Sequence, residues 1–227
     1  MADNWRTGVT RHIELERCKM PLDQLGHKLG PHSQPLLGMV FRLLRKIKPA
    51  RERVVPGELP DLVEREHIAR YEFAKSYCNG KTVADIACGS GYGSDILRQV
   101  AKKVDSYDKE LLCDNFIIDL DKESWDKSYE VIVCFETIEH LRNPCFFLAN
   151  AYHTAKLLII STPLGEFKGY NPHHKQTWEL PEFSAKLERW FDCTYYFQDG
   201  VSISAEAETP KRFVIAVAWP KKRSYII

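Results

Sequence analysis

Residues 83–93 read VADIACGSGYG, and this stretch decides how the chain folds. Its first half is a short apolar run, and its second half places glycines at positions 89, 91 and 93. A strand that runs into a glycine turn and then opens a helix brings backbone N–H groups close to a ligand, because glycine has no Cβ in the way. The G-x-G-x-G spacing and the acid Asp85 inside the run favour a ligand that ends in an amino acid over a pyrophosphate, because an ammonium group attracts a carboxylate.

The rest of the chain alternates between strand-like and helix-like segments. The runs at residues 129–135 and 156–161 are almost continuously apolar, which is typical of strands buried on both faces of a parallel sheet. The sequence therefore predicts an α/β fold, a doubly wound, Rossmann-like and mostly parallel seven-stranded sheet. Helices are predicted at residues 62–77, 91–102, between residues 135 and 156, and from about residue 181; the other strands are predicted at residues 82–87, 103–107, 116–120, 193–197 and 212–219, with a polar turn at residues 199–210.

Two further acids are predicted to lie beside the glycine turn. Asp108 ends the second predicted strand and Asp119 lies near the end of the third. The carboxyl ends of parallel strands meet at one edge of the sheet, where a carboxylate can bind the two hydroxyls of a ribose. We therefore expect Asp85, Asp108 and Asp119 to contact one ligand.

Residues 1–52 differ from the rest of the chain and are predicted to form a helical appendage to a domain at residues 53–227. At residues 36–48, apolar side chains recur every three or four positions, which predicts a short amphipathic helix. Residues 42–53 contain six basic residues and one acid. Two interpretations remain open: the apolar stripe docks on the domain, or the basic helix contacts a membrane surface or a polyanion.

Length and composition exclude several classes of protein. The chain has 227 residues, 28% of them charged, and a formal net charge of +1, which is typical of a soluble folded protein and indicates no particular partner. No apolar run approaches the roughly 18 residues of a transmembrane segment, and the first residues lack the apolar core of a signal peptide. We therefore expect a cytoplasmic protein, in the host cytoplasm if the source is a virus. The seven cysteines are scattered without a C-x-x-C pair, which argues against disulfides and a cysteine zinc site.

The chain resembles class I S-adenosylmethionine-dependent methyltransferases over about residues 52–220. The resemblance rests on the DIACGSGYG turn at residues 85–93 together with VIVCFETIEHL at residues 131–141. It implies S-adenosyl-L-methionine as the cofactor. Its methionine end would lie at Asp85, Ala87, Gly89 and Gly91, its ribose at Asp108, and its adenine at Asp119 and Leu120.

The segments RVVPGE at residues 53–58 and EHIARY at residues 66–71 resemble the lead-in helix of sugar and natural-product methyltransferases. In those enzymes this helix covers the cofactor, which implies a cofactor contact for Tyr71. One departure from the family concerns the connection between Asp108 and Phe116. Only seven residues separate the two, so the usual connecting helix is predicted to be vestigial.

The motif E-T-I-E-H places Glu136, Glu139 and His140 at positions i, i+3 and i+4. On a helical turn these side chains would share one face, as metal ligands or an acid–base cluster require. The motif and the downstream S-T-P are similar to small-RNA 3′-terminal 2′-O-methyltransferases. That resemblance implies a divalent cation, Mg²⁺ or Mn²⁺, held by Glu136, Glu139, His140 and His174, with His173 as the competing choice. The alternative is that His140 or His174 is the catalytic base and no metal binds.

Three functions follow from these predictions. The first is an O-methyltransferase that acts on a sugar hydroxyl, in a glycan or an activated sugar, through a metal-chelated diol where a metal binds. The second is a ribose 2′-O-methyltransferase that acts on RNA ends; the near-neutral charge and the lack of a recognisable RNA-binding module place it second. The third is a catalytically inactive cofactor-binding subunit.

Overall fold

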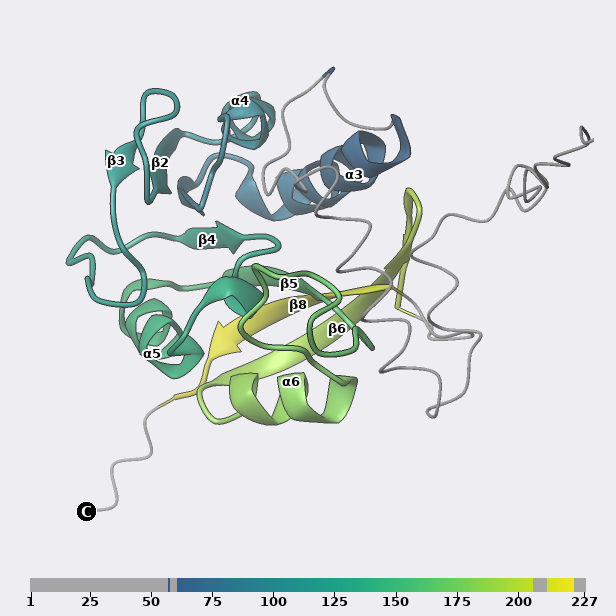
Figure 1. The fold of residues 1–227 in the computed structure, drawn as a ribbon. Coiled ribbons are helices and arrows are strands. Elements are labelled where there is room, and N and C mark those ends of the chain that lie inside the picture. Colours follow the sequence, from purple (N-terminus) through teal and green to yellow (C-terminus); the bar gives the residue numbers. More distant parts are fainter. Residues whose placement is uncertain (1–56, 58–60, 206–211, 223–227) are drawn as a thin grey trace, which may run out of the picture.

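The computed structural model describes residue 57, residues 61–205 and residues 212–222 (Figure 1). The predicted appendage at residues 1–52, with its basic helix, lies outside the described residues. Within the described ranges, no helix is both long and apolar enough to cross a membrane.

A single mixed sheet organises the described part of the chain, with its strands in the order β3-β2-β1-β4-β5-β8-β6-β7. The first five strands of this order pair in parallel, whereas β8 is antiparallel to β5 and β6, and β7 is antiparallel to β6. The predicted Rossmann-like architecture is confirmed, with eight strands instead of seven. The strands are β1 (Thr82–Ile86), β2 (Lys103–Asp108), β3 (Phe116–Ile117), β4 (Val131–Cys134), β5 (Leu158–Pro163), β6 (Phe191–Asp199), β7 (Ser202–Ser204) and β8 (Phe213–Pro220).

Helices cover both faces of the sheet, and each strand divides its side chains between the two. Figure 1 shows α3 and α4 on one side of the sheet and α5 and α6 on the other. In β4, Val131 and Val133 pack in the apolar cluster of α3 and α4, while Ile132 and Cys134 pack in that of α5 and α6. This alternation buries β4 on both faces, as its continuous apolar sequence predicts. The helices are α3 (Asp61–Cys78), α4 (Tyr92–Arg98), the 3₁₀ helix η3 (Ile138–His140), α5 (Pro144–Thr154) and α6 (Leu180–Leu187).

Strand β7 is the strand that the sequence does not predict. It lies within residues 199–210, which were predicted as a polar turn, and it pairs with the end of β6. Its three residues are too few for an alternating pattern to be recognised, so only the pairing with β6 defines the strand.

Strand β3 is shorter than the predicted strand at residues 116–120. Residues 109–115 form no helix, which agrees with the prediction of a vestigial connection. Phe116 and Ile117 remain 57% and 63% exposed. Asp119 therefore lies in a turn beyond this short edge strand and not at a strand end.

Close packing between α3 and the start of α4 determines where the glycine turn lies. The ring of Tyr71 in α3 lies directly over Gly93, where a Cβ would be 2.0 Å from the Cζ atom of that ring. The same ring meets Phe135 edge to face, with the ring centroids 5.1 Å apart. Only glycine leaves room for this ring at position 93.

We expect Gly93→Ala to lower the free energy of unfolding by about 1–3 kcal/mol, because the added methyl group overpacks the contact with Tyr71. Urea denaturation followed by circular dichroism measures the change. The double variant with Tyr71→Leu should lose less unfolding free energy than the two single variants together, because leucine leaves the space over position 93 that the tyrosine ring fills. Strictly additive losses would contradict this packing role.

Candidate functional site

The turn between β1 and α4 has the backbone conformation that its glycines allow. Gly89 and Gly91 adopt φ angles of +56° and +87°. A Cβ at Gly91 would lie 2.9 Å from the Sγ atom of Cys113, so the short connection after β2 packs directly against the turn. Ala87 also adopts a φ of +60°, a conformation that costs a residue with a Cβ about 1–2 kcal/mol. The strained and glycine-dependent backbone coincides with the predicted ligand site.

Asp85 is fully buried behind this turn and is not among the residues that line the cavity described below. Its carboxylate accepts hydrogen bonds from the Tyr71 hydroxyl at 3.1 Å and from the Ser94 hydroxyl at 2.6 Å. Burial raises the pKa of Asp85 to about 7, although both hydrogen bonds oppose the shift. Asp85 thus joins β1 to α3 and α4, and its contact with a ligand stays a prediction.

Asp108 lines the cavity beside the glycine turn. Its Oδ2 accepts a hydrogen bond from the backbone N–H of Gly89 at 3.0 Å, and its Oδ1 accepts one from the N–H of Glu110 at 3.2 Å. The carboxylate is therefore held at the mouth of the turn, where the sequence predicts a ribose contact.

Asp119 and Leu120 line the same cavity at the outer edge of the sheet. Lys122 and Lys109 form ion pairs with the Asp119 carboxylate at 3.1 and 3.6 Å. The hydrogen bond from Lys122 lowers the pKa of Asp119. Any contact between Asp119 and an adenine would thus compete with two lysines.

The E-T-I-E-H motif does not form the single helical face that was predicted. The helix η3 is a 3₁₀ helix that begins after Glu136, and Glu136 itself adopts a φ of +49°. The hydroxyl of Ser161 in β5 donates to the Glu136 carboxylate at 2.7 Å and accepts from the Glu136 N–H at 3.2 Å. The chain turns sharply at the end of β4, so the neighbouring strand fixes the orientation of Glu136.

Glu139 is a buried acid in which one carboxylate oxygen has a hydrogen-bond partner among the described residues and the other has none. Its Oε2 accepts a hydrogen bond from the Thr162 hydroxyl at 3.1 Å, whereas its Oε1 has no hydrogen-bond partner among the described residues. Burial, and then the negative charge of Glu136, raise the pKa of Glu139 well above its usual value. A buried oxygen without a partner is costly unless a proton or a cation reaches it.

The backbone of η3 holds the loop that carries the histidines. The N–H groups of Lys175 and Gln176 both donate to the carbonyl oxygen of Glu139, at 2.7 and 2.9 Å. The His140 Nδ1 atom lies 3.3 Å from the carbonyl oxygen of His173. Because a carbonyl oxygen only accepts, Nδ1 of His140 carries the proton and Nε2 keeps its lone pair when the ring is neutral.

His174, and not His173, reaches this cluster. One ligand atom from each of Glu139, His140 and His174 lies within 4.8 Å of the others, and the two rings meet edge to face with centroids 4.7 Å apart. Glu136 does not belong to this group of atoms. Among the residues predicted to hold a metal, the structure therefore brings three together and leaves Glu136 beside them.

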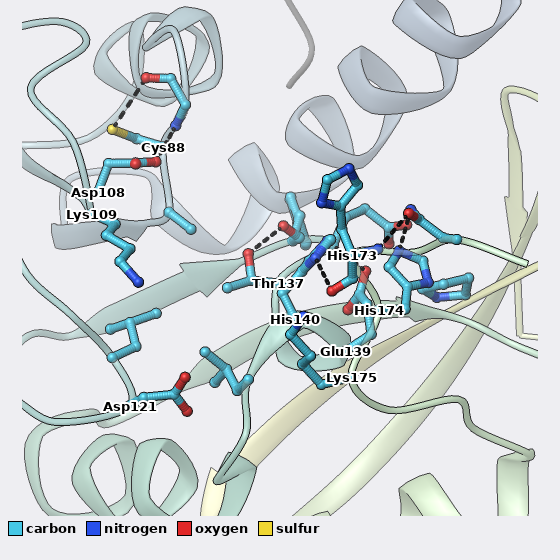
Figure 2. Close-up of a pocket in the computed structure, with 18 of the residues that line it drawn as sticks. Cys88, Asp108, Lys109, Asp121, Thr137, Glu139, His140, His173, His174 and Lys175 are labelled. Carbon is cyan, nitrogen blue, oxygen red and sulfur yellow. Dashed lines mark hydrogen bonds and ion pairs between the residues drawn. The ribbon is translucent and has the colours of Figure 1, made fainter. Parts of the chain in front are cut away.

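One cavity connects all of these groups. It has a volume of about 960 Å³ and is lined by residues from the glycine turn, Asp108, the E-T-I-E-H motif and the histidine loop. Figure 2 shows Cys88 and Asp108 at one end of this pocket and Glu139, His140 and His174 at the other. Of the predicted cofactor residues, Asp85 and Gly91 do not line it; those that do are Tyr71, Ala87, Gly89, Asp108, Asp119 and Leu120.

Sequence reasoning missed two residues that contact His174. The carboxylate of Glu166 lies 2.5 Å from its Nδ1 atom, and the side-chain amide of Asn171 lies 2.8 Å from its Nε2 atom. Both residues lie in the same loop as His174, and neither belongs to a recognisable motif. A polar residue in a loop without periodicity carries no sequence signal that distinguishes a site residue from a solvated one.

The cluster fits a divalent cation in some respects and not in others. The Oε1 of Glu139, which accepts no hydrogen bond from the described residues, lies 4.0 Å from the Nε2 of His140. Both atoms are suitable ligands for Mg²⁺ or Mn²⁺. The Nε2 atom of His174, in contrast, already has the Asn171 amide as a partner, which a cation would have to replace.

Comparison with known proteins places this geometry in context. A family described as "Methyltransferase domain" matches residues 55–197. A probable S-adenosylmethionine-dependent methyltransferase from Mycolicibacterium smegmatis is 26% identical over 159 residues, which is 60% of this chain and 62% of that relative. This chain therefore matches less than two thirds of the length of that relative.

Two solved structures share the fold. One is the N-methyltransferase NodS from Bradyrhizobium japonicum in complex with S-adenosyl-L-homocysteine. The match has a TM-score of 0.57 at 11% identity and covers 80% of this chain and 99% of the NodS chain. The other is the small RNA methyltransferase HEN1. That match has a TM-score of 0.56 at 20% identity and covers 78% of this chain and 27% of the HEN1 chain.

The raised pKa of Asp85 predicts a pH-dependent stability. Its folded-state pKa of about 7 exceeds its ordinary value of 3.8, so the folded protein binds the proton more tightly, and the unfolding free energy falls as the pH rises through this interval. Asp85→Asn removes this titration. It can keep both hydrogen bonds, because the Tyr71 and Ser94 hydroxyls can accept from an amide as well as donate to it. We expect this variant to exceed the parent by on the order of 3 kcal/mol near pH 8 and by less near pH 5.

Urea denaturation at several pH values measures this difference. The matched control is Asp95→Asn in α4, the helix that carries Ser94, because the Asp95 side chain is 74% exposed and pairs only with the partly exposed Arg98 among the described residues. Its stability should run parallel to that of the parent protein across the range. An Asp85→Asn curve that also runs parallel to the parent would show that Asp85 has an ordinary pKa.

Proposed function

The chain belongs to the class I S-adenosylmethionine-dependent methyltransferases, and from this premise we propose that it transfers the methyl group of S-adenosyl-L-methionine to a hydroxyl. The proposed acceptor is a sugar, in a glycan or in an activated form. The observation that carries the proposal is the single cavity that joins the glycine turn and Asp108 to the cluster of Glu139, His140 and His174. A donor at one end and an acceptor at the other would share one cavity.

The donor end fits a nucleoside with an amino-acid tail. The backbone at Ala87 and Gly89 lines the cavity, and the turn leaves space there because no Cβ projects from Gly89. The Asp108 carboxylate would accept hydrogen bonds from the ribose hydroxyls, and Leu120 would pack against the base. When bound, the sulfonium compound supplies an activated methyl group, so the protein's task is to position it and to remove the acceptor proton.

The acceptor end fits a hydroxyl group that must lose its proton. The lone pair on Nε2 of His140 is suited to take that proton directly, since imidazole titrates near neutral pH. Alternatively, Glu139, His140 and His174 would hold a divalent cation, which would lower the pKa of a coordinated hydroxyl. Two adjacent hydroxyls, as in a sugar, would bind such a cation together as a chelate, and this favours a sugar acceptor.

The second candidate function is ribose 2′-O-methylation at RNA ends. A ribose at a 3′ end also presents two adjacent hydroxyls, and the E-x-x-E-H cluster, with His174 after S-T-P, supports this acceptor equally well. The two candidates differ in the number of phosphates on the acceptor, because RNA carries one at every nucleotide, an activated sugar only a few and a neutral glycan none. RNA binding should weaken steeply with salt, whereas methylation of a neutral sugar should not.

We expect Asp108→Asn to weaken the binding of S-adenosyl-L-homocysteine by about 10–100-fold, because hydrogen bonds to a charged acceptor are lost. Isothermal titration calorimetry on the full chain measures the affinity. Asp114→Asn, at an exposed position on the neighbouring connection, should bind like the parent protein. An unchanged affinity for the Asp108 variant would contradict the ribose role.

We expect the protein to transfer the labelled methyl group of S-adenosyl-L-methionine to sugar acceptors. Glu139→Gln should reduce that transfer by at least about 100-fold and leave the affinity for S-adenosyl-L-homocysteine unchanged. Glu72→Gln, on the exposed side of α3, is the control. Running the assay with EDTA and then with Mg²⁺ or Mn²⁺ separates the metal route from the imidazole route. Tight cofactor binding without product from any hydroxylated acceptor would instead support a catalytically inactive subunit.

A further inference from the structure

We propose that Glu166 is a positioning residue that holds His174 in one tautomer, so that Nε2 is the nitrogen available to a cation or a proton. The inference rests on the proposed function for the role of His174 in acceptor chemistry. The tautomer itself follows from contacts within the chain and does not depend on the identity of the acceptor.

The tautomer is determined by a series of three hydrogen bonds. The backbone N–H of His173 donates to Asn171 Oδ1 at 3.1 Å, which fixes the orientation of the side-chain amide. The Nδ2 group of Asn171, which can only donate, lies 2.8 Å from His174 Nε2. Nε2 must therefore be the acceptor, and the proton of the neutral ring lies on Nδ1, which donates to Glu166 Oε2 at 2.5 Å.

The Glu166–His174 contact is shielded from water. The two side chains are only 16% and 8% exposed, so a hydrogen bond between them competes little with solvent. A carboxylate that accepts from one imidazole nitrogen also increases the basicity of the other nitrogen. Glu166 thus prepares Nε2 to bind a cation or to accept a proton, and Asn171 occupies that lone pair until either arrives.

Closure of the loop does not require the Glu166 side chain. The neck of the loop is closed by backbone contacts, in which Gly165 N–H donates to the Trp178 carbonyl at 2.9 Å and Leu164 pairs with Trp178. Its C-terminal part is held by the hydrogen bonds from the N–H groups of Lys175 and Gln176 to the carbonyl oxygen of Glu139. The Glu166 carboxylate is therefore expected to act on His174 and not on the path of the chain.

Long-range ¹H–¹⁵N NMR of the imidazoles in the full chain tests the tautomer directly. The spectra are recorded near pH 8, above the ordinary imidazole pKa of about 6.5, and the His174 signals are assigned by their loss in His174→Gln. We expect the Nδ1–H tautomer in the parent protein and in Glu166→Gln, whose amide oxygen still accepts. In Glu166→Ala, Nδ1 loses its acceptor and only the Asn171 amide still favours the Nδ1–H form. We therefore expect the Nε2–H tautomer to become populated beside it, whereas the control Glu72→Gln should show no change.

Binding of Mn²⁺, followed by electron paramagnetic resonance without any substrate, provides the second measurement. We expect Glu166→Ala to weaken Mn²⁺ binding by about 10–100-fold and Glu166→Gln to weaken it less. An unchanged His174 tautomer in Glu166→Ala would overturn the inference. If the parent protein binds no Mn²⁺ but Glu166→Ala changes the tautomer, the metal route of the proposed function fails and the positioning role of Glu166 is supported.

Discussion

A carboxylate buried beneath the glycine turn is the constraint on which the donor end of the site depends. Asp85 accepts hydrogen bonds from α3 through Tyr71 and from α4 through Ser94. The Ser94 hydroxyl in turn accepts from Ser106 in β2 at 2.8 Å, and Ser106 accepts from Arg98 at 2.9 Å. This network fixes α4 relative to β2, and Asp108 follows Ser106 by only two residues. The turn and Asp108 are thus held at a constant separation by polar contacts of which only Tyr71 lines the cavity.

The acceptor end depends on a different kind of constraint. His140 lies in η3, whereas His174 lies on a loop whose position is set by the carbonyl oxygen of Glu139, which accepts from two backbone N–H groups of that loop. The residue that offers an unpartnered carboxylate oxygen therefore also anchors the loop that brings His174 to it. A change in the backbone at Glu139 would displace both parts of the cluster together.

The donor end was predictable from sequence because its contacts are local or follow from sheet topology. The VADIACGSGYG turn determines its own conformation, and parallel strands necessarily bring Asp108 to the same edge as this turn. The orientation of Glu136 was not predictable, because it depends on Ser161, which lies 25 residues away in the next strand. The contacts of Glu166 and Asn171 depend on how an irregular loop folds back on itself, and no periodicity records that path.

Charge balance connects the two ends of the cavity. Burial, and then the charges of Glu136 and Glu166, raise the pKa of Glu139, so the acceptor end brings several carboxyl groups together. A sulfonium donor is a cation that becomes neutral when its methyl group leaves, and an uncompensated negative site would stabilise it more before transfer than after. An acceptor hydroxyl would also resist losing its proton beside unpaired carboxylates. In the proposed reaction, productive transfer therefore requires that these acids first be neutralised. Either a divalent cation held by Glu139, His140 and His174 or a proton on Glu139, whose pKa is raised, would meet that requirement.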